Sequence, residues 1–284
     1  MRFAKSLVGL AMFTGALMAS GAALAVPVIN AGGIGVPLGA DQISQTDYET
    51  LITAVNQSFE GVGQVNSIIG TGGTQGYGSG SAPPPPFLYD EFSGFTVRSI
   101  VINPDTSITI SLTGGELNYY TFASNQLTNI LTQPTADASV SYVKTGNLAN
   151  PSSLWLALTP KPLDSNLDTV IITIPAGSNL QNIGDSTADA FLDVNTSLLG
   201  PASPLFETCT FTDTNAPAAD CPAMRVDLSF QGGASNSGLG APNFAISGVD
   251  NVKAFAVPEP LTISLFGAGL VGAAAFGRRK AKKA

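Results

Sequence analysis

The sequence predicts an all-β protein, and we expect its main domain to be an antiparallel β-sandwich of the jelly-roll-like kind. Short runs rich in β-branched and aromatic residues recur along the middle of the chain, and Gly, Pro and Asn separate them. Several runs also alternate apolar with polar side chains, which is the period of a half-buried strand. Ile108, Ile110 and Leu112, for example, are expected to share one face of a strand.

The expected strands cover 95–102, 108–112, 116–122, 140–143, 154–159, 169–174, 225–230, 243–249 and 251–257. Thr113, Gly114 and Gly115 separate two of these strands and are expected to form a hairpin turn. Strands at this spacing are typical of an antiparallel sandwich or barrel, and we favour the sandwich.

The segment 44–59 allows two interpretations. Tyr48, Leu51, Ile52, Val55 and Phe59 stand at helical spacing, which predicts an amphipathic helix. The Thr and Val content of the segment and its β-rich surroundings favour a strand instead. We expect a strand here, with the helix as the alternative.

Three regions divide the chain: a signal peptide over 1–25, a secreted β-rich domain over 26–257 and a sorting tail over 258–284. Within the domain, 70–86 is rich in Gly, Ser and Pro and is expected to be a long surface loop. The loop could instead divide off an N-terminal unit, but 26–69 alone has little apolar area for a stable core.

The first 25 residues have the three parts of a secretory signal peptide. Arg2 and Lys5 precede an apolar stretch over 7–17, and small residues follow it. Cleavage is expected between Ala25 and Val26, because small residues stand at the positions that a signal peptidase reads. The alternative is an N-terminal membrane helix that stays attached, which the run of small residues disfavours.

The other end of the chain carries Pro258-Glu259-Pro260, an uncharged stretch over 261–277 and a basic end that begins with Arg278 and Arg279. As a helix, the stretch would reach roughly 25 Å, so we expect a transmembrane helix over 261–277. The basic end belongs on the cytoplasmic side, which leaves the rest of the chain outside. The alternative is an ordinary C-terminal anchor.

These three parts, in this order at the end of a chain, resemble the PEP-CTERM sorting signal. The resemblance covers about the last 28 residues and implies recognition by an exosortase of a Gram-negative bacterium, with removal of the tail. It also implies transient anchoring in the inner membrane after export by the Sec machinery, and release to the cell surface or the extracellular matrix.

A second, scattered resemblance is to flocculation-associated PEP-CTERM proteins. It lies in the segments 41–49, 59–65, 114–120 and 153–158, and the insertion at 70–86 departs from it. This family implies a secreted β-rich protein that holds cells together with exopolysaccharide.

Charge and cysteine content fit an exported protein. Without the two ends, five basic and nineteen acidic side chains remain, a formal charge near −14. Such a body is repelled by phosphate backbones, so nucleic acid is excluded as a partner. Cys209 and Cys221 are expected to form a disulfide. A redox pair is the alternative, but the Cys-x-x-Cys spacing is absent.

The residues for common catalytic chemistry are missing. The chain has no histidine, which removes His-dependent triads and the usual zinc sites. A glycosidase needs only two carboxylates, but no pair stands out. Asp185, Asp189 and Asp193, together with Asn195, are weak calcium candidates, because oxygen ligands are dense here but lack the spacing and the turn glycine of a calcium loop. We therefore expect no cofactor.

Three aromatic residues are candidates for sugar contacts. Trp155 is expected to point away from the strand face that carries Leu154, Leu156 and Leu158, and Tyr119 and Tyr120 are adjacent in another strand. Exposed rings of this kind could stack on sugars; burial under a loop is the alternative.

These observations predict an exported surface or matrix protein, structural or adhesive in exopolysaccharide-dependent aggregation, and not an enzyme. The alternative is a secreted carbohydrate-binding module or a carbohydrate-active enzyme. The fold alone does not decide between them, because a sandwich can serve each purpose.

Overall fold

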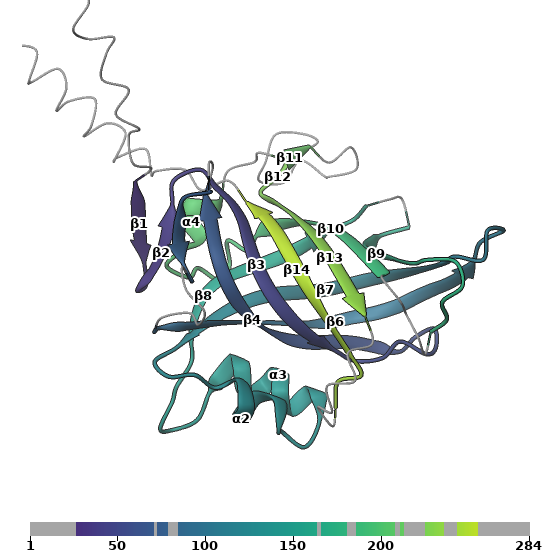
Figure 1. Cartoon of the computed structure of the whole chain (residues 1–284), viewed down its shortest axis with the longest axis horizontal. Coiled ribbons are helices and arrows are strands. Elements are labelled where there is room, and N and C mark those ends of the chain that lie inside the picture. Colours follow the sequence, from purple (N-terminus) through teal and green to yellow (C-terminus); the bar gives the residue numbers. More distant parts are fainter. Residues whose placement is uncertain are drawn as a thin grey trace, which may run out of the picture.

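Eight antiparallel strands close into a barrel in the described part of the computed structural model (Figure 1). The structure describes residues 27–70, 73–78, 85–163, 166–180, 186–207, 211–212, 225–235 and 243–254. The barrel strands are β3 (Ala40–Glu49), β4 (Ser58–Gly70), β6 (Phe87–Ile102), β7 (Ile108–Phe122), β8 (Ser153–Lys161), β10 (Ser186–Val194), β13 (Leu228–Ser235) and β14 (Ile246–Ala254).

Each barrel strand pairs with the next one along the chain, and β14 pairs with β3 to close the ring. A ninth strand, β9 (Asp168–Ile174), pairs with the first half of β7 and with β10, while β8 pairs with the second half of β7 and with β10. The two short strands β8 and β9 therefore fill one gap between β7 and β10.

The expected β-sandwich is wrong. The sheet closes on itself instead of dividing into two facing layers, because β10 pairs with β13 and β14 pairs with β3. Alternation of apolar and polar side chains is the same in a sandwich and in a barrel, so the sequence pattern could not separate the two architectures.

One end of the barrel is filled by side chains. The Trp155 ring is fully buried there, and its Nε1–H donates to the Ala31 carbonyl at 2.9 Å. The ring makes edge contacts with Tyr119 and Phe206, at centroid distances of 6.2 Å and 5.9 Å. Ala31 and Phe206 belong to β1 (Val28–Ala31), which pairs with β2 (Ile34–Pro37), and to α4 (Ser203–Phe206).

Two helices cover part of the outer face of the barrel (Figure 1). They are α2 (Leu127–Leu131) and α3 (Ala136–Thr145). Ile130, Val140 and Val143 of the helices are buried over Val62 and Phe122 of the strands beneath. The barrel thus has two apolar layers in this region, one inside the wall and one between the wall and the helices.

The expected strand over 140–143 is therefore wrong, because these residues lie in α3. The helix begins at Thr135, whose hydroxyl accepts a hydrogen bond from the Ala138 N–H at 3.1 Å. Asp137 stands in the first turn, where a negative charge is favourable. A run of four residues was too short to distinguish a strand from one turn of a buried helix.

The expected turn at Gly114 and Gly115 is also wrong, because both residues lie within the continuous strand β7. Their φ angles are +73° and +92°, which bend the strand without reversing it. A Cβ on Gly115 would lie 2.2 Å from a ring atom of Phe95, so the glycine also makes room for that ring.

The segment 44–59 forms the end of β3, a turn over 50–57 and the first residues of β4. The expected strand is confirmed only at the two ends of this segment, over 44–49 and 58–59, and the alternative helix is not formed. The expected loop over 70–86 contains a short strand, β5 (Gln75–Tyr77), paired with β4. Buried Tyr77 accepts the Leu88 N–H at 3.0 Å, which ties this segment to the barrel.

Both ends of the chain lie outside the described residues, and so do Cys209 and Cys221. No helix within the described ranges is long and apolar enough to cross a membrane. The described residues contain no disulfide either. The expected transmembrane helix over 261–277 and the expected disulfide thus find no support in the structure. The remaining described strands, β11 (Phe211–Thr212) and β12 (Arg225–Val226), form a separate pair.

Candidate functional site in the barrel lumen

The inner face of β3 is polar. Along this strand Ile43, Gln45, Asp47 and Glu49 alternate with outward-facing residues and point into the barrel. Neighbouring strands add three more polar side chains at the same depth. We call this group the lumen cluster; its members are Gln45, Asp47, Glu49, Asp90, Tyr119 and Asp250.

Glycines in adjacent strands make room for the carboxyl groups. Gly63 pairs with Asp47 on one side and with Asp90 on the other. A Cβ on Gly63 would lie 1.8 Å from Asp47 Oδ1 and 2.3 Å from Asp90 Oδ1. A Cβ on Gly232 would lie 2.5 Å from Asp250 Oδ1. The two aspartates thus converge over the Gly63 backbone, in a space that any other residue would fill.

A short hydrogen-bond chain satisfies only part of the lumen cluster. The Tyr119 hydroxyl donates to Gln45 Oε1 at 2.8 Å, and Gln45 Nε2 donates to Asp47 Oδ2 at 2.9 Å. The Gly233 N–H donates to Asp250 Oδ1 at 2.9 Å. Asp47 Oδ1 and both carboxyl oxygens of Asp90 have no donor, although both residues are 0% exposed.

Burial dominates the electrostatics of these carboxyl groups. It raises the pKa of Asp47 and Asp250 well above the ordinary value, and the negative charge of the neighbouring acid adds to the rise. Burial likewise raises the pKa of Asp90 well above its ordinary value, and a proton shared from the neighbouring Asp47 carboxyl group would oppose part of that rise. For Glu49, burial and then the Asp250 charge raise the pKa to about 8.

Among the described residues, the ion pairs that the structure shows all lie outside the lumen cluster. Arg98 pairs with Asp168, Lys144 with Glu91 and Glu116, and Lys161 with Asp193. Asp47 lies within hydrogen-bonding reach of Asp90 and Asp250. The carboxyl groups can therefore share protons, or they can bind a positively charged donor.

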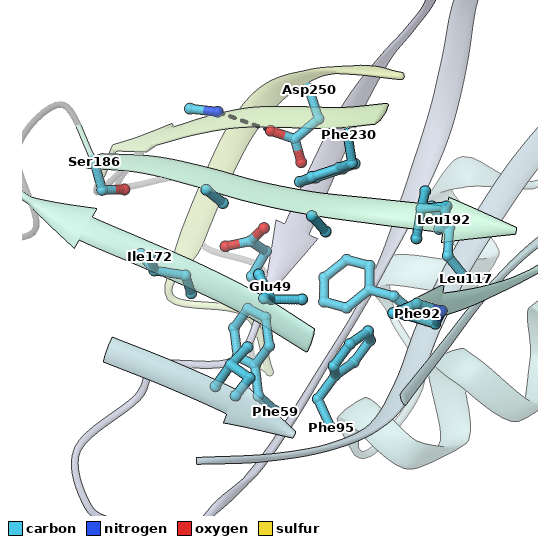
Figure 2. A pocket seen from close by; sticks show the side chains of 16 residues that line it. Glu49, Phe59, Phe92, Phe95, Leu117, Ile172, Ser186, Leu192, Phe230 and Asp250 are labelled. Atoms are coloured by element: carbon cyan, nitrogen blue, oxygen red, sulfur yellow. Dashed lines mark hydrogen bonds between the residues drawn. The ribbon is translucent and has the colours of Figure 1, made fainter. Parts of the chain in front are cut away.

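A cavity of about 60 Å³ lies beside the lumen cluster. Glu49 and Asp250 form its polar wall, and Figure 2 shows both carboxyl groups facing the same space as the phenylalanine rings. The rings that line the cavity are those of Phe59, Phe92, Phe95 and Phe230. A second cavity of about 30 Å³ shares Glu49 and Phe59 with the first. The site is thus mostly apolar, with acid at one side.

The cavity lies toward the end of the barrel opposite Trp155. Glu49 is at the end of β3 that pairs with Ile246, whereas Trp155 is at the start of β8, near Tyr119. Gly233, which also lines the cavity, is exposed, and Phe230 is half-buried. Solvent can therefore approach the cavity from this end of the barrel.

The expected sugar contacts are not formed at the aromatic candidates. Trp155 and Tyr119 are 0% exposed, so neither ring offers a face to solvent. Tyr120 is half-buried against the apolar layer under α2 and α3. The pairing of β7 with β8 shifts register at Tyr119 and Tyr120, which interrupts the alternation of β8 side chains between the two faces of the sheet. Trp155 therefore fills the barrel end instead of facing outward.

Of the weak calcium candidates, the two that the structure describes, Asp189 and Asp193, do not converge. Asp189 and Asp193 lie on β10, which was not expected as a strand, and Asp185 lies outside the described residues. Asp189 is exposed, while the carboxylate of buried Asp193 pairs with Lys161 Nζ at 2.6 Å. No three His, Cys, Asp or Glu side chains within the described ranges are arranged to hold a metal ion.

A second group of buried polar residues lies outside the barrel wall, under α3. We call it the outer cluster; its members are Glu91, Glu116, Asn118 and Lys144. Lys144 Nζ lies 2.6 Å from Glu116 Oε1 and 3.4 Å from Glu91 Oε1. Asn118 Nδ2 donates to Glu91 Oε1 at 2.7 Å. Here the buried carboxylate has a cation, in contrast to the lumen.

Sequence reasoning missed the lumen cluster. The signal that could have found it is the alternation of Ile43, Gln45, Asp47 and Glu49, together with glycines at Gly61 and Gly63 in the next strand. Comparison with family models, curated proteins and solved structures finds no match to this chain. The resemblance to a sorting signal lies in residues outside the described ranges, among them Pro258, Glu259, Pro260, Arg278 and Arg279.

Proposed function

We propose that this protein is exported and serves at the cell surface or in the extracellular matrix as a structural or adhesive component, not as an enzyme. The observation that carries this proposal is the sequence at the two sides of the barrel: residues 1–25 have the pattern of a signal peptide, and residues 258–284 resemble a sorting signal. The Sec machinery and an exosortase would be its partners during export, and exopolysaccharide its partner afterwards.

The geometry favours this role over a carbohydrate-active enzyme. The lumen does bring carboxyl groups together, as a glycosidase requires. They border a cavity of only about 60 Å³, however, which has room for a few water-sized atoms and not for a sugar ring. The burial of Trp155 and Tyr119 removes the aromatic platform on which a sugar-binding module would depend.

Part of the acidity of the exported body lies inside the fold. Asp47, Asp90 and Asp250 are buried in the lumen, and Asp168 and Asp193 are buried in ion pairs. Fewer carboxylates therefore face solvent than the formal charge suggests. Bridging of molecules by divalent cations, which needs exposed carboxylates on both partners, is correspondingly limited.

A deletion strain tests the adhesive role. Settling of producing cells is compared among the parent, the deletion strain, and the deletion strain carrying either the full gene or a gene that ends at Val257. We expect settling to be lost on deletion and restored only by the full gene. Settling of the parent with and without a chelator measures the contribution of divalent cations.

Three outcomes would contradict parts of the proposal. A deletion strain that settles like its parent would exclude the adhesive role. Full rescue by the tail-less gene would show that the sorting tail is not needed for that role. An unaltered C-terminus in the mature protein, measured by mass spectrometry, would exclude exosortase processing.

A further inference from the structure

Two features of the lumen meet at the same place. Buried carboxyl oxygens without donors lie in the middle of the barrel, on Asp47 and Asp90. An apolar cavity bordered by Glu49 and Asp250 adjoins this group through Asp250, which is within hydrogen-bonding reach of Asp47; Asp47 and Asp90 themselves do not line the cavity. The acceptors and the space for a donor are therefore adjacent.

Buried acceptors without donors are costly, since an unsatisfied buried polar group loses its hydration without replacement. Two fixed donors serve its carboxyl groups, Gln45 Nε2 and the Gly233 N–H, and the Tyr119 hydroxyl donates to Gln45. The other carboxyl oxygens can be satisfied by protons shared between Asp47, Asp90 and Asp250, or by a ligand. A ligand that fits must bring N–H or O–H groups and preferably positive charge.

The shape and lining of the cavity restrict the ligand further. At the roughly 10–15 Å³ that one water needs, about four or five non-hydrogen atoms fit into a cavity of about 60 Å³. The phenylalanine rings suit an alkyl chain, and their faces attract a cation. A bare metal ion is disfavoured, because no three described acidic side chains are arranged to hold one.

We propose that the barrel lumen binds a small primary alkylammonium ion of three or four carbons, with its nitrogen between Glu49 and Asp250 and its chain against Phe59, Phe92 and Phe95. An ammonium group has three donors, enough to reach two carboxylates and leave one for a further oxygen. The alkyl chain removes its apolar surface from water among the rings.

The site is reached from the end of the barrel that carries Glu49 and Gly233. The opposite end is filled by Trp155, Tyr119 and Phe206. A single open end orients the ligand, because the acidic wall and the phenylalanine rings occupy different sides of the cavity (Figure 2).

Calorimetric titration of the full-length purified protein tests this inference. The probe is n-butylammonium chloride at pH 8.5, and the comparison ligands are butan-1-ol and butyrate, which have similar size but no positive charge. We expect butylammonium to bind at least tenfold more tightly than either comparison ligand, because its hydrogen bonds to carboxylates are charge-assisted.

Substitutions locate the binding. Glu49→Gln and Asp250→Asn should each weaken butylammonium binding about tenfold or more. Asp189→Asn is the matched control, because it removes one exposed carboxylate from the outer face of β10 and should leave binding unchanged. Thermal melting of each variant shows whether the barrel remains folded.

The proposal fails if butylammonium does not bind, or if butan-1-ol binds equally well. It also fails if a folded Glu49 or Asp250 variant keeps full affinity, or if Asp189→Asn weakens binding as much as they do. The comparison of the three ligands on the unaltered protein decides the question even if a variant does not fold. The settling assay is independent, so failure of one proposal leaves the other standing.

Discussion

Asp90 and Glu91 are neighbours in β6, yet they lie on opposite sides of the barrel wall. Both are 0% exposed. Asp90 points into the lumen, where neither of its carboxyl oxygens has a donor. Glu91 points outward, where Asn118 donates to it and Lys144 lies 3.4 Å away, so that one of its two oxygens is engaged.

The difference shows two ways of placing a carboxyl group away from water. Outside the wall, α3 covers the group and brings a cation: burial still raises the pKa of Glu91, but the Asn118 hydrogen bond and the Lys144 charge oppose part of that rise. Inside the wall the described residues place neither a helix nor a cation, and Asp90 must share protons with Asp47 or meet a charged ligand. Ion pairing is built into the outer cluster but not into the lumen cluster.

The largest expected effect is on the pH dependence of stability. The pKa of Glu49 is about 8 in the folded barrel and near 4.5 when unfolded, and the pKa values of Asp47, Asp90 and Asp250 are also raised well above ordinary by burial. At pH values between the unfolded and the folded pKa of each group, the folded state holds more protons than the unfolded state. The free energy of unfolding should therefore fall as pH rises from about 5 to 8.5, by on the order of 3 kcal/mol or more.

The outer cluster should contribute differently. Its cation, Lys144, has a pKa raised above 10.5 by the hydrogen bond to Glu116 and the charges of Glu91 and Glu116, against the opposing effect of burial. Its stabilisation is lost only as pH rises through that higher value. Urea unfolding at a series of pH values measures both regions. A free energy that is flat or rises between pH 5 and 8.5 would contradict the assignment of proton sharing to the lumen.

A matched pair of substitutions separates the two sides of the wall. Asp90→Asn should stabilise the protein at pH 8 by about 1–3 kcal/mol, because it removes the cost of keeping the buried carboxyl group protonated at that pH and its new amide can donate to Asp47. Glu91→Gln should stabilise it less or not at all, since Asn118 and Lys144 already oppose the effect of burial on Glu91, and Lys144 loses a partner. Equal gains for the two changes in urea unfolding would show that the wall does not separate two environments.

The local pattern predicted individual strands but not their closure. Ile108, Ile110 and Leu112 are buried on one side of β7 as their alternation predicts. Closure depends on the pairing of β14 with β3, in which Ile246 lies opposite Glu49. Nothing in a window of ten residues records a pairing between segments almost 200 positions apart, so the sequence could not show that the sheet is a barrel.

The lumen cluster was hidden for a different reason. Inner positions of a strand are expected to be apolar, and β3 places Gln45, Asp47 and Glu49 there. Segment 44–59 consequently looked ambiguous between helix and strand. The carboxyl groups become recognisable as a group only when β6 and β14 bring Asp90 and Asp250 to them.

Removal of the cation tests the outer cluster directly. Lys144→Met leaves Glu91 and Glu116 without their positive partner and should lower the free energy of unfolding by about 1–2 kcal/mol. The loss is smaller than for a fully buried ion pair, because the Lys144 side chain is 31% exposed and solvent screens its charge. Lys253→Met, at an exposed position on β14, is the control and should change stability by less than about 0.5 kcal/mol. A variant as stable as the parent would mean that Glu91 is buried without help from Lys144.

The smallest expected effect concerns the helix that carries the cation. Thr135→Ala removes the hydroxyl that accepts the Ala138 N–H, and loss of such a cap costs about 1 kcal/mol. Thr145→Ala is the control, because the Thr145 hydroxyl donates to Ser141 at the exposed end of the helix and caps no N–H. Glu60 of β4 also faces this helix: burial and a hydrogen bond with Asp137, in the first turn of α3, raise the pKa of Glu60 to about 7. The cost of Thr135→Ala is therefore compared by urea unfolding at pH 8.5, where Glu60 is ionised. A Thr135→Ala variant as stable there as Thr145→Ala would show that this cap does not hold α3 over the outer cluster.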